Sequence, residues 1–337
     1  MSTTPDIPAG LPALPQHPEI ARWRPALESD IDALVALSRA MDPFDNPHRV
    51  TSRDEIADEF DHEWIDMETD SLLAIAPDGE VVAFAMVVLA PSRDVSVYSY
   101  VFGGVHPDWR GRGIGRLVLS WSLERSEQQL DSVENAAPRS SRAYVDEHNP
   151  SAARLFERHG FSVARYFTIM ERDLSLPVDE IPVPEGVRLV QYGPEYADRT
   201  RVARNDSFRD HWGSLETVPP MWQQFVGGSH FRDELSVIGV EADGRVVGFT
   251  LAEVDEASWD AQGFTSAYIA LVGTVRDWRG RRLAPALLAA ALTRIAAAGL
   301  ERATLEVDTA SPTGALGLYE RQGFVATTRE LAYVRER

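Results

Sequence analysis

Two apolar patterns alternate along this chain, one typical of strands and one of amphipathic helices. In the first half, helical spacing covers residues 29–41, 113–129 and 150–159. Strand patterns in that half cover residues 72–75, 81–89, 95–105, 142–146 and 161–171. In the second half, helical spacing covers residues 195–207, 283–298 and 313–322. Strand patterns there cover residues 187–190, 235–240, 246–254, 267–275, 303–308 and 324–334. This order predicts a mixed α/β (α+β) fold.

The second half repeats the first at the level of single residues. The segment DWRGR occurs at residues 108–112 and again at 277–281. Likewise, ERHGF at residues 157–161 corresponds to ERQGF at 320–324. Each pair holds the same place in the series of strands and helices, which indicates an internal duplication. A chain of 337 residues is long enough for two domains, each with its own core.

Proline-rich segments without periodicity mark the expected domain boundaries. Residues 1–19 contain five prolines and few aliphatic residues, so we expect a flexible N-terminus there. Residues 175–186 (SLPVDEIPVPEG) have the composition of a linker. We therefore expect an N-terminal domain at residues 20–174 and a C-terminal domain at 187–337.

Composition narrows the possible functions. The net charge of −19 argues against broad nucleic-acid binding, because such proteins usually carry a basic face. The chain has no cysteine, which excludes disulfides and thiolate chemistry and fits a cytoplasmic protein. No apolar run is long enough to cross a membrane, and the N-terminus lacks the pattern of a secretory signal. We expect no metal, no membrane and no nucleic-acid partner.

Residues 103–116 (GGVHPDWRGRGIGR) carry the clearest chemical signal. A strand ends before Pro107, and closely spaced glycines with three arginines lead into a helix. Such a turn directs backbone N–H groups and guanidinium groups toward an anion at a helix N-terminus, and it suits a pyrophosphate. A P-loop is excluded because the chain has no lysine, and a dinucleotide fingerprint because the glycines follow several strands.

The segment Val105-x-Pro107-x-x-Arg110-Gly111-x-Gly113-Ile114-Gly115 resembles the acetyl-CoA loop of the GNAT superfamily, whose core is Arg/Gln-x-x-Gly-x-Gly/Ala. Downstream, residues 149–161 resemble the family's helix beside the pantetheine arm, which usually carries tyrosine where this chain has Phe156. The resemblance extends over both halves. It implies two tandem GNAT folds, each with a mixed central sheet that is splayed at the acetyl-CoA site and flanked by helices.

The resemblance also implies how the first half binds acetyl-CoA. The backbone at Gly103, Gly104 and Val105 would bond the pantetheine, and the strands at 95–105 and 142–146 would part to admit the thioester. Asn149 would reach the cofactor arm or instead cap the next helix, and both roles stay open. The pyrophosphate would be cradled by Arg110, Gly111, Arg112, Gly113, Ile114, Gly115 and Arg116.

The second copy departs from the family pattern in its loop and restores it in its last helix. Arg282 stands where the first copy has Gly113, whereas Tyr319 is the tyrosine that Phe156 replaces. In the family this hydroxyl usually protonates the departing CoA thiolate, and the alternative is a packing role. The expected cofactor-binding residues of this copy are Val272, Gly273, Thr274, Arg279, Gly280, Arg281, Arg282, Leu283, Ala284 and Pro285.

The general base and the acceptor pocket are less defined. Glu253, Glu306 and Asp308 are candidate bases in the second half, and Glu147 and His148 are candidates in the first. The family places its acceptor site after the first helix of the fold. There, His211 and Trp212 would line the pocket or form the packed end of a helix.

The expected function is acetyl-CoA-dependent N-acetyltransfer to the primary amine of a small molecule. Alternatives are acetylation of a thiol precursor, as in tandem GNAT enzymes of the mycothiol synthase type, and a catalytically weak module that binds or senses acyl-CoA. Both halves would bind acetyl-CoA with the C-terminal one catalytic, or only one half would be functional. We expect a monomer or homodimer.

Overall fold

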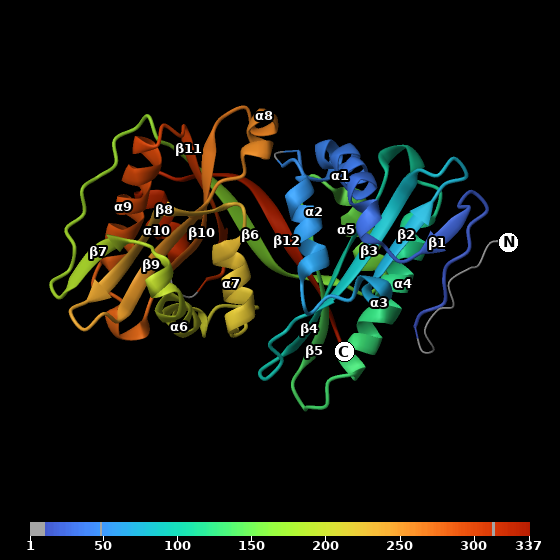
Figure 1. The fold of residues 1–337 in the computed structure, drawn as a ribbon, viewed down its shortest axis with the longest axis horizontal. Helices are drawn as coiled ribbons and strands as arrows, with labels where there is room; N and C mark the ends of the chain where they lie inside the picture. Colours follow the sequence, from blue (N-terminus) through green and yellow to red (C-terminus); the bar gives the residue numbers. More distant parts are fainter. Residues whose placement is uncertain (1–10, 48, 312–313) are drawn as a thin grey trace. The chain divides into compact units, whose positions relative to one another are not determined.

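A computed structural model describes residues 11–47, 49–311 and 314–337 of the chain, which divides into two compact units (Figure 1). The first unit ends at Ala164 and also includes the last residues, Ala332–Arg337. The second unit is Arg165–Leu331. Each unit therefore contains a strand from the end of the other repeat.

The first unit has a mixed sheet with flanking helices. Its strands are β1 (Arg22–Arg24), β2 (Ser71–Ile75), β3 (Val81–Leu89), β4 (Val97–Val105) and β5 (Arg139–Asp146). They lie in the order β1-β2-β3-β4-β5, followed by the end of β12 (Val325–Glu336), and only β4 and β5 pair in parallel among the first five. Its helices are α1 (Ile31–Asp45), α2 (Arg53–Asp61), α3 (Met67–Asp70), α4 (Ile114–Asp131) and α5 (Pro150–Arg158).

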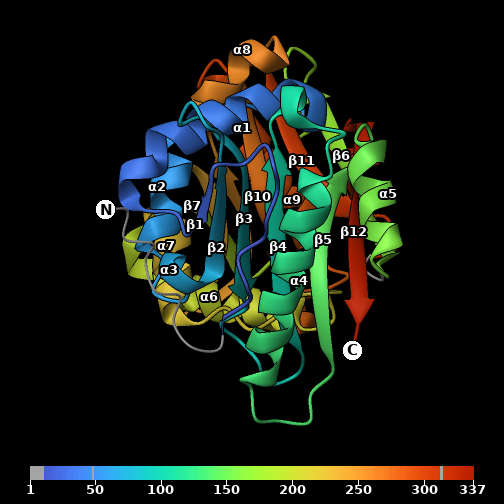
Figure 2. The ribbon, with the colours of Figure 1, turned by 90° about the vertical axis from the view of Figure 1, so that its right-hand side faces the viewer.

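Alternating side chains of β3 build a core on both faces of this sheet. Ala83 and Ala85 pack with Val118 and Trp121 of α4, which lies across β3 and β4 in Figure 2. Phe84, between the two alanines, packs instead with Leu37 and Met41 of α1. The two helices therefore cover opposite faces, as the amphipathic pattern of each requires.

The second unit repeats this plan. Its strands are β6 (Ser162–Asp173, from Arg165 on), β7 (Val187–Gln191), β8 (Phe231–Glu241), β9 (Val246–Glu253), β10 (Ser266–Thr274), β11 (Arg302–Asp308) and the first part of β12. Their order is β12-β6-β11-β10-β9-β8-β7. Its helices are α6 (Ala197–Phe208), α7 (Pro219–Gly227), α8 (Trp259–Gln262), α9 (Leu283–Ala297) and α10 (Ala315–Arg321).

Two neighbouring residues of β9 show that α6 and α9 cover opposite faces of this second sheet. Phe249 stacks on Phe208 of α6, with ring centroids 6.4 Å apart. Gly248 faces α9 so closely that an added Cβ would lie 2.7 Å from Leu287. The glycine is thus needed for the close approach of helix and sheet.

Both sheets open at the same place. β4 pairs with β5 only from Val97 to Tyr100, although β4 continues to Val105. β10 pairs with β11 only from Ser266 to Tyr268 and continues to Thr274. The predicted fold class, two mixed α/β units whose central sheets are splayed and flanked by helices, is confirmed.

The observed elements match most of the predicted ones within a few residues. The helix expected at 313–322 is seen as α10 from Ala315, and Thr313 lies outside the described residues. Strand β1, the short helices α3 and α8, and the longer helices α2 and α7 were not predicted. Of the proposed N-terminal segment, residues 1–10 lie outside the described residues, and residues 11–19 form no helix or strand. Leu14 packs against the first core.

The compact units are not bounded where the sequence pattern breaks, near residue 174. β6 pairs along its length with β11, from Asp173 opposite Arg302 to Phe167 opposite Asp308. Residues 175–186 contain no helix or strand. Strand pairing over long sequence separations is not encoded in local periodicity, so the compact units cannot be derived from the sequence pattern. The domains at residues 20–174 and 187–337 follow the two repeats along the chain and stay a prediction.

Candidate active site

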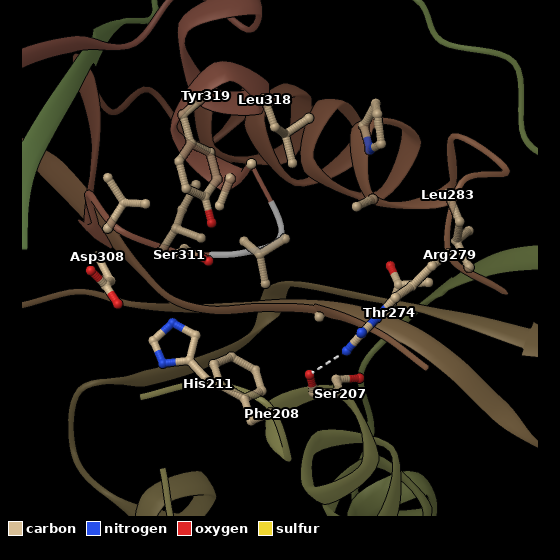
Figure 3. Close-up of a pocket in the computed structure, with 18 of the residues that line it drawn as sticks. Ser207, Phe208, His211, Thr274, Arg279, Leu283, Asp308, Ser311, Leu318 and Tyr319 are labelled. Atoms are coloured by element: carbon tan, nitrogen blue, oxygen red, sulfur yellow. Dashed lines mark hydrogen bonds between the residues drawn. The ribbon is translucent and has the colours of Figure 1, made fainter. Parts of the chain in front are cut away.

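A cavity of about 830 Å³ lies in the second unit, where β10 and β11 part (Figure 3). It contains Tyr319 and, except for Arg281, the residues predicted to bind acetyl-CoA in this copy. The loop at residues 279–285, called the second loop below, forms one end. Glu306, Asp308 and His211 also line the cavity. Most residues that sequence reasoning assigned to the C-terminal site thus lie together, whereas Arg281, Glu253 and Trp212 do not line the cavity.

The second loop leads into α9 through a left-handed residue. Arg282 is the N-cap of α9 with φ 65° and ψ 21°. Gly113 holds the same position at the start of α4, with φ 91° and ψ −7°. The two loops therefore share one backbone path, and each presents helix N-terminal N–H groups that have no partner within the helix. Such groups bind an anion, which fits the pyrophosphate of acetyl-CoA.

The first arginine of each loop is held by a carboxylate at the end of the unit's first helix. Arg279 lies 3.4 Å from Asp210 and donates to the carbonyl oxygen of Ser207 at 2.8 Å. In the first unit, Arg110 pairs with Asp45 at 2.7 Å. Burial raises the pKa of Asp45 above its ordinary value, and the charge of Arg110 opposes that rise. Both arginines therefore tie their loop to the segment after the first helix.

Tyr319 lies on α10 with its hydroxyl directed into the cavity (Figure 3). Its ring packs edge-on against Phe324 at 5.9 Å, and only 7% of the residue is exposed. Burial raises the pKa of Tyr319 to about 12. The phenol is therefore protonated at neutral pH and can donate a proton to a thiolate. Its catalytic role stays a prediction.

Glu306 lies on β11 and lines the same cavity. Burial raises its pKa from 4.5 to about 7. The pKa of Tyr268, across the opening, is raised first by burial and then by the nearby negative charges of Glu306 and Glu253. A carboxylate with a pKa near 7 suits a general base at physiological pH.

Asp308 has a structural role that the sequence did not distinguish. One of its carboxylate oxygens accepts from the backbone N–H of Ala310 at 2.9 Å, and the other lies 3.7 Å from Arg165. Asp146 bonds the N–H of His148 in the same way at the end of β5. Both aspartates thus stabilise the turn after the strand. Among the predicted bases, the geometry favours Glu306.

Aromatic side chains form the part of the cavity wall nearest Asp308. His211 and Phe208 line it from the end of α6, and Phe167 lines it from β6. Trp212 packs behind Phe167, with ring centroids 6.2 Å apart. Of the two residues expected to line the acceptor pocket, His211 lines the cavity, whereas Trp212 contacts the lining residue Phe167.

In the first unit, the predicted site residue Asn149 and Phe156, which stands at the expected tyrosine position, make structural contacts within the unit. Asn149 caps α5 by accepting from Ala152 at 3.0 Å, and its amide donates to Asp45 at 2.8 Å. Phe156 packs on Phe161 and Tyr333. Gly103, Gly104 and Val105 end β4, and a Cβ on Gly104 would lie 2.5 Å from the sulfur of Met41.

The arginines that follow in the first loop are exposed. Arg112 stacks on Trp109 at 4.7 Å and pairs with Glu19 at 2.9 Å, while Arg116 is exposed on α4. Gly111, between Arg110 and Arg112, adopts φ 78°. Within the loop as far as Gly115, only Ile114 is buried. Binding of acetyl-CoA at this loop stays a prediction.

Comparison with known proteins identifies the family. The model of the acetyltransferase (GNAT) family matches residues 37–161 and again 198–324. The chain belongs to this family. It is an acyltransferase that uses acetyl-CoA as donor, and its two matches coincide with the two repeats.

Individual relatives agree with this assignment. A mycothiol acetyltransferase of Thermobispora bispora is 31% identical, over 68% of this chain and 74% of the relative. One of Salinispora tropica is 28% identical, over 90% of this chain and 92% of the relative.

Solved structures show the same fold. A GCN5-related N-acetyltransferase from Sphaerobacter thermophilus matches with a TM-score of 0.70 and 28% identity, over 94% of this chain and 95% of that chain. A tandem GNAT protein from the clavulanic acid biosynthesis pathway matches with a TM-score of 0.69, over 94% and 98%. The second is only 16% identical and shows the fold alone.

Sequence reasoning missed Phe167, Phe208 and Tyr268 as cavity residues. Phe167 belongs to β6, and nothing in its neighbourhood along the chain signals pairing with β11. Tyr268 was detectable as a residue of the predicted strand at 267–275.

In the part of the chain that the structure describes, no helix is both long and apolar enough to span a membrane.

Proposed function

We propose that the second unit transfers the acetyl group of acetyl-CoA to a primary amine of a small molecule. The observation that carries this proposal is the presence of Glu306 and Tyr319 in one cavity with the second loop. The loop would hold the pyrophosphate through the N–H groups at the start of α9, with Arg282 adding charge. The opening between β10 and β11 would admit the thioester.

Glu306 and Tyr319 would divide the proton transfers between them. Glu306 would accept a proton from the ammonium group, directly or through water, and so free the amine to attack the acetyl carbon. As the new C–N bond forms and the C–S bond breaks, Tyr319 would donate its proton to the departing sulfur. Once the C–N bond has formed, the nitrogen gives up a second proton to the Tyr319 phenolate, directly or through water, which restores the phenol and leaves one hydrogen on the amide nitrogen. Glu306 releases the proton that it accepted to solvent.

Local charge supports a cationic acceptor. Glu253 and Glu330 raise the pKa of Tyr268 together with Glu306, so several carboxylates lie close to this end of the cavity. Acidic walls attract an ammonium group and raise its local concentration. The net charge of −19 acts in the same direction at long range.

The first unit would bind acetyl-CoA without catalysing transfer. It keeps the left-handed Gly113 at the helix start and the parted strands β4 and β5. Phe156 occupies the tyrosine position, and its ring offers no proton to a thiolate.

A Tyr319→Phe variant tests the assignment of the acid. We expect kcat to fall about 10²-fold or more, the usual contribution of a general acid, while acetyl-CoA binding by calorimetry changes less than about threefold. Tyr192→Phe is the matched control, since Tyr192 is a buried tyrosine outside the cavity whose pKa is also raised to about 12. Unchanged turnover in Tyr319→Phe would contradict the assignment.

A thiol-bearing precursor of mycothiol is the second candidate acceptor, supported by the names of the relatives at 26–31% identity. Comparing kcat/KM for that precursor with values for simple primary amines decides between them. We also propose a cytoplasmic location and a monomeric or homodimeric state. The domains at residues 20–174 and 187–337 are proposed as the two repeats along the chain, as distinct from the two compact units.

A further inference from the structure

The second cavity takes part of its wall from the first repeat. β6 follows α5 in the chain, but its residues from Arg165 onward belong to the second unit. There it pairs antiparallel with β11, the strand that carries Glu306. Phe167 of β6 reaches the cavity. A residue of the first repeat is thus positioned to contact the acceptor of the second.

The strand register places Phe167 on the same face as Glu306. Phe167 lies opposite Asp308, and Ile169 lies opposite Glu306. Directly opposed residues of an antiparallel pair share a face, and diagonal neighbours have Cβ atoms about 7–8 Å apart. If the amine of an acceptor meets Glu306, a group attached two or three bonds from its nitrogen can therefore reach the Phe167 ring.

Packing holds the Phe167 ring in position. The indole of Trp212 lies 6.2 Å from it, and the guanidinium of Arg165 lies 5.2 Å from the same indole. Arg165 also approaches Asp308 at 3.7 Å. With Phe208 and His211 nearby in the lining, the ring is part of an aromatic wall rather than an isolated side chain.

We propose that Phe167 selects primary amines that carry an aromatic or similarly flat apolar ring two or three bonds from the nitrogen. Aromatic walls favour flat apolar groups through stacking and burial, whereas the neighbouring carboxylates bind the ammonium group. This inference rests on the proposed function of the second unit and adds the shape of its acceptor.

The test compares 2-phenylethylamine with ethylamine as acceptors for the full chain. The wild type is expected to show kcat/KM at least about tenfold higher for 2-phenylethylamine, and Phe167→Ala is expected to lose about tenfold for that amine alone. Phe167→Leu keeps apolar volume, so a lost ring preference at an unchanged melting temperature separates stacking from folding. Tyr166→Ala is the matched control, because Tyr166 is the next aromatic residue on β6 and lies outside the cavity lining, near Arg329.

Binding of 2-phenylethylamine, measured by calorimetry in the presence of CoA, separates this inference from the proposed function. Binding that depends on Phe167 without turnover of either amine supports the aromatic wall and overturns the amine-transfer proposal. Turnover of both amines with no ring preference overturns the inference and leaves the proposed function in place. Equal losses in Phe167→Ala and Tyr166→Ala, or no binding of 2-phenylethylamine by the wild type, also overturn it.

Discussion

Glu306 and Tyr319 line the same cavity, and burial raises the pKa of both. The shift makes one side chain a better base and keeps the other available as an acid. The pKa of Glu306 rises to about 7, which makes its carboxylate a stronger base that is about half ionised at neutral pH. The pKa of Tyr319 rises to about 12, which keeps the phenol protonated and available as a donor. One apolar environment thus prepares a base and an acid.

The pH profile of turnover tests the role of Glu306. The base acts in its ionised form, so kcat/KM is expected to rise with pH and to have a midpoint at about 7, the raised pKa of Glu306. Below that pH the carboxyl is protonated and accepts no proton. In Glu306→Gln we expect kcat/KM at pH 8 to fall about 10²-fold and the limb near pH 7 to disappear.

Glu253→Gln provides the matched comparison for this profile. Glu253 lies opposite Tyr268 on the neighbouring strand β9 and was an equal candidate base in the sequence. We expect this variant to keep the limb near pH 7. If the limb instead persists in Glu306→Gln and vanishes in Glu253→Gln, the base assignment moves to Glu253.

Single residues show where sequence reasoning reached its limit. Tyr319 was identifiable because it fills a position of a recognisable motif. Glu306 and Asp308 were equivalent in the sequence, since both are acidic residues on one face of a predicted strand. Only the fold shows that Asp308 bonds the following turn, whereas Glu306 is desolvated in the cavity.

At the scale of elements, the N-cap of α9, Arg282, has a strained left-handed backbone conformation and a positively charged side chain. Arg282 is the one non-glycine residue with positive φ in the described part of the chain. A side chain in the left-handed region costs about 1–2 kcal/mol relative to the right-handed form, and glycine avoids that cost. The guanidinium at this position lies beside the expected pyrophosphate.

An Arg282→Gly variant should therefore change stability and affinity in opposite directions. We expect the free energy of unfolding to rise by up to about 1 kcal/mol, the relief of strain being partly offset by the entropy of glycine in the unfolded chain. Binding of acetyl-CoA should weaken about threefold to tenfold through loss of a cation. Denaturant unfolding and calorimetry measure the two effects.

The reverse change at the equivalent position of the first unit is the control. Gly113→Arg places a side chain at φ 91°, so it should lower the free energy of unfolding by about 1–2 kcal/mol. Tighter binding of acetyl-CoA by Arg282→Gly would show that the arginine does not serve the phosphates.

Most helices and strands were predictable from the sequence pattern. The sequences of the two longer helices that were missed, α2 and α7, explain why they were not predicted. α2 has the sequence RDEIADEFD, in which few apolar residues set a period. Its start was nevertheless marked, since Ser52 and Glu55 form a capping box. α7 begins with Pro219 and Pro220, which resemble a loop until their place in the first helical turn is considered.

At the scale of the whole molecule, the repeats exchange their last strands. β6 contributes most of its length to the second unit, and the end of β12 belongs to the first. The duplication was visible as repeated pentapeptides, but the exchange was not, because it depends on pairing between residues such as Phe167 and Asp308 that lie far apart in the chain. The second cavity consequently depends on both repeats.

The number of acetyl-CoA molecules bound per chain tests how far the two units remain equivalent. Both keep a left-handed residue at the loop and a parted pair of strands. We therefore expect calorimetry on the full chain to give two sites. Gly113→Asp and Arg282→Asp each introduce a carboxylate where the pyrophosphate would bind, and each should remove one site.

Turnover then assigns the roles of the two sites. Arg282→Asp should lower kcat/KM strongly, because its loop belongs to the cavity with Tyr319, whereas Gly113→Asp should leave turnover within about twofold. A single site in the wild type that survives Gly113→Asp would restrict acetyl-CoA binding to the second unit. Loss of turnover in Gly113→Asp alone would place catalysis in the first unit, with Phe156 at the tyrosine position, and would require a different proton donor for the thiolate.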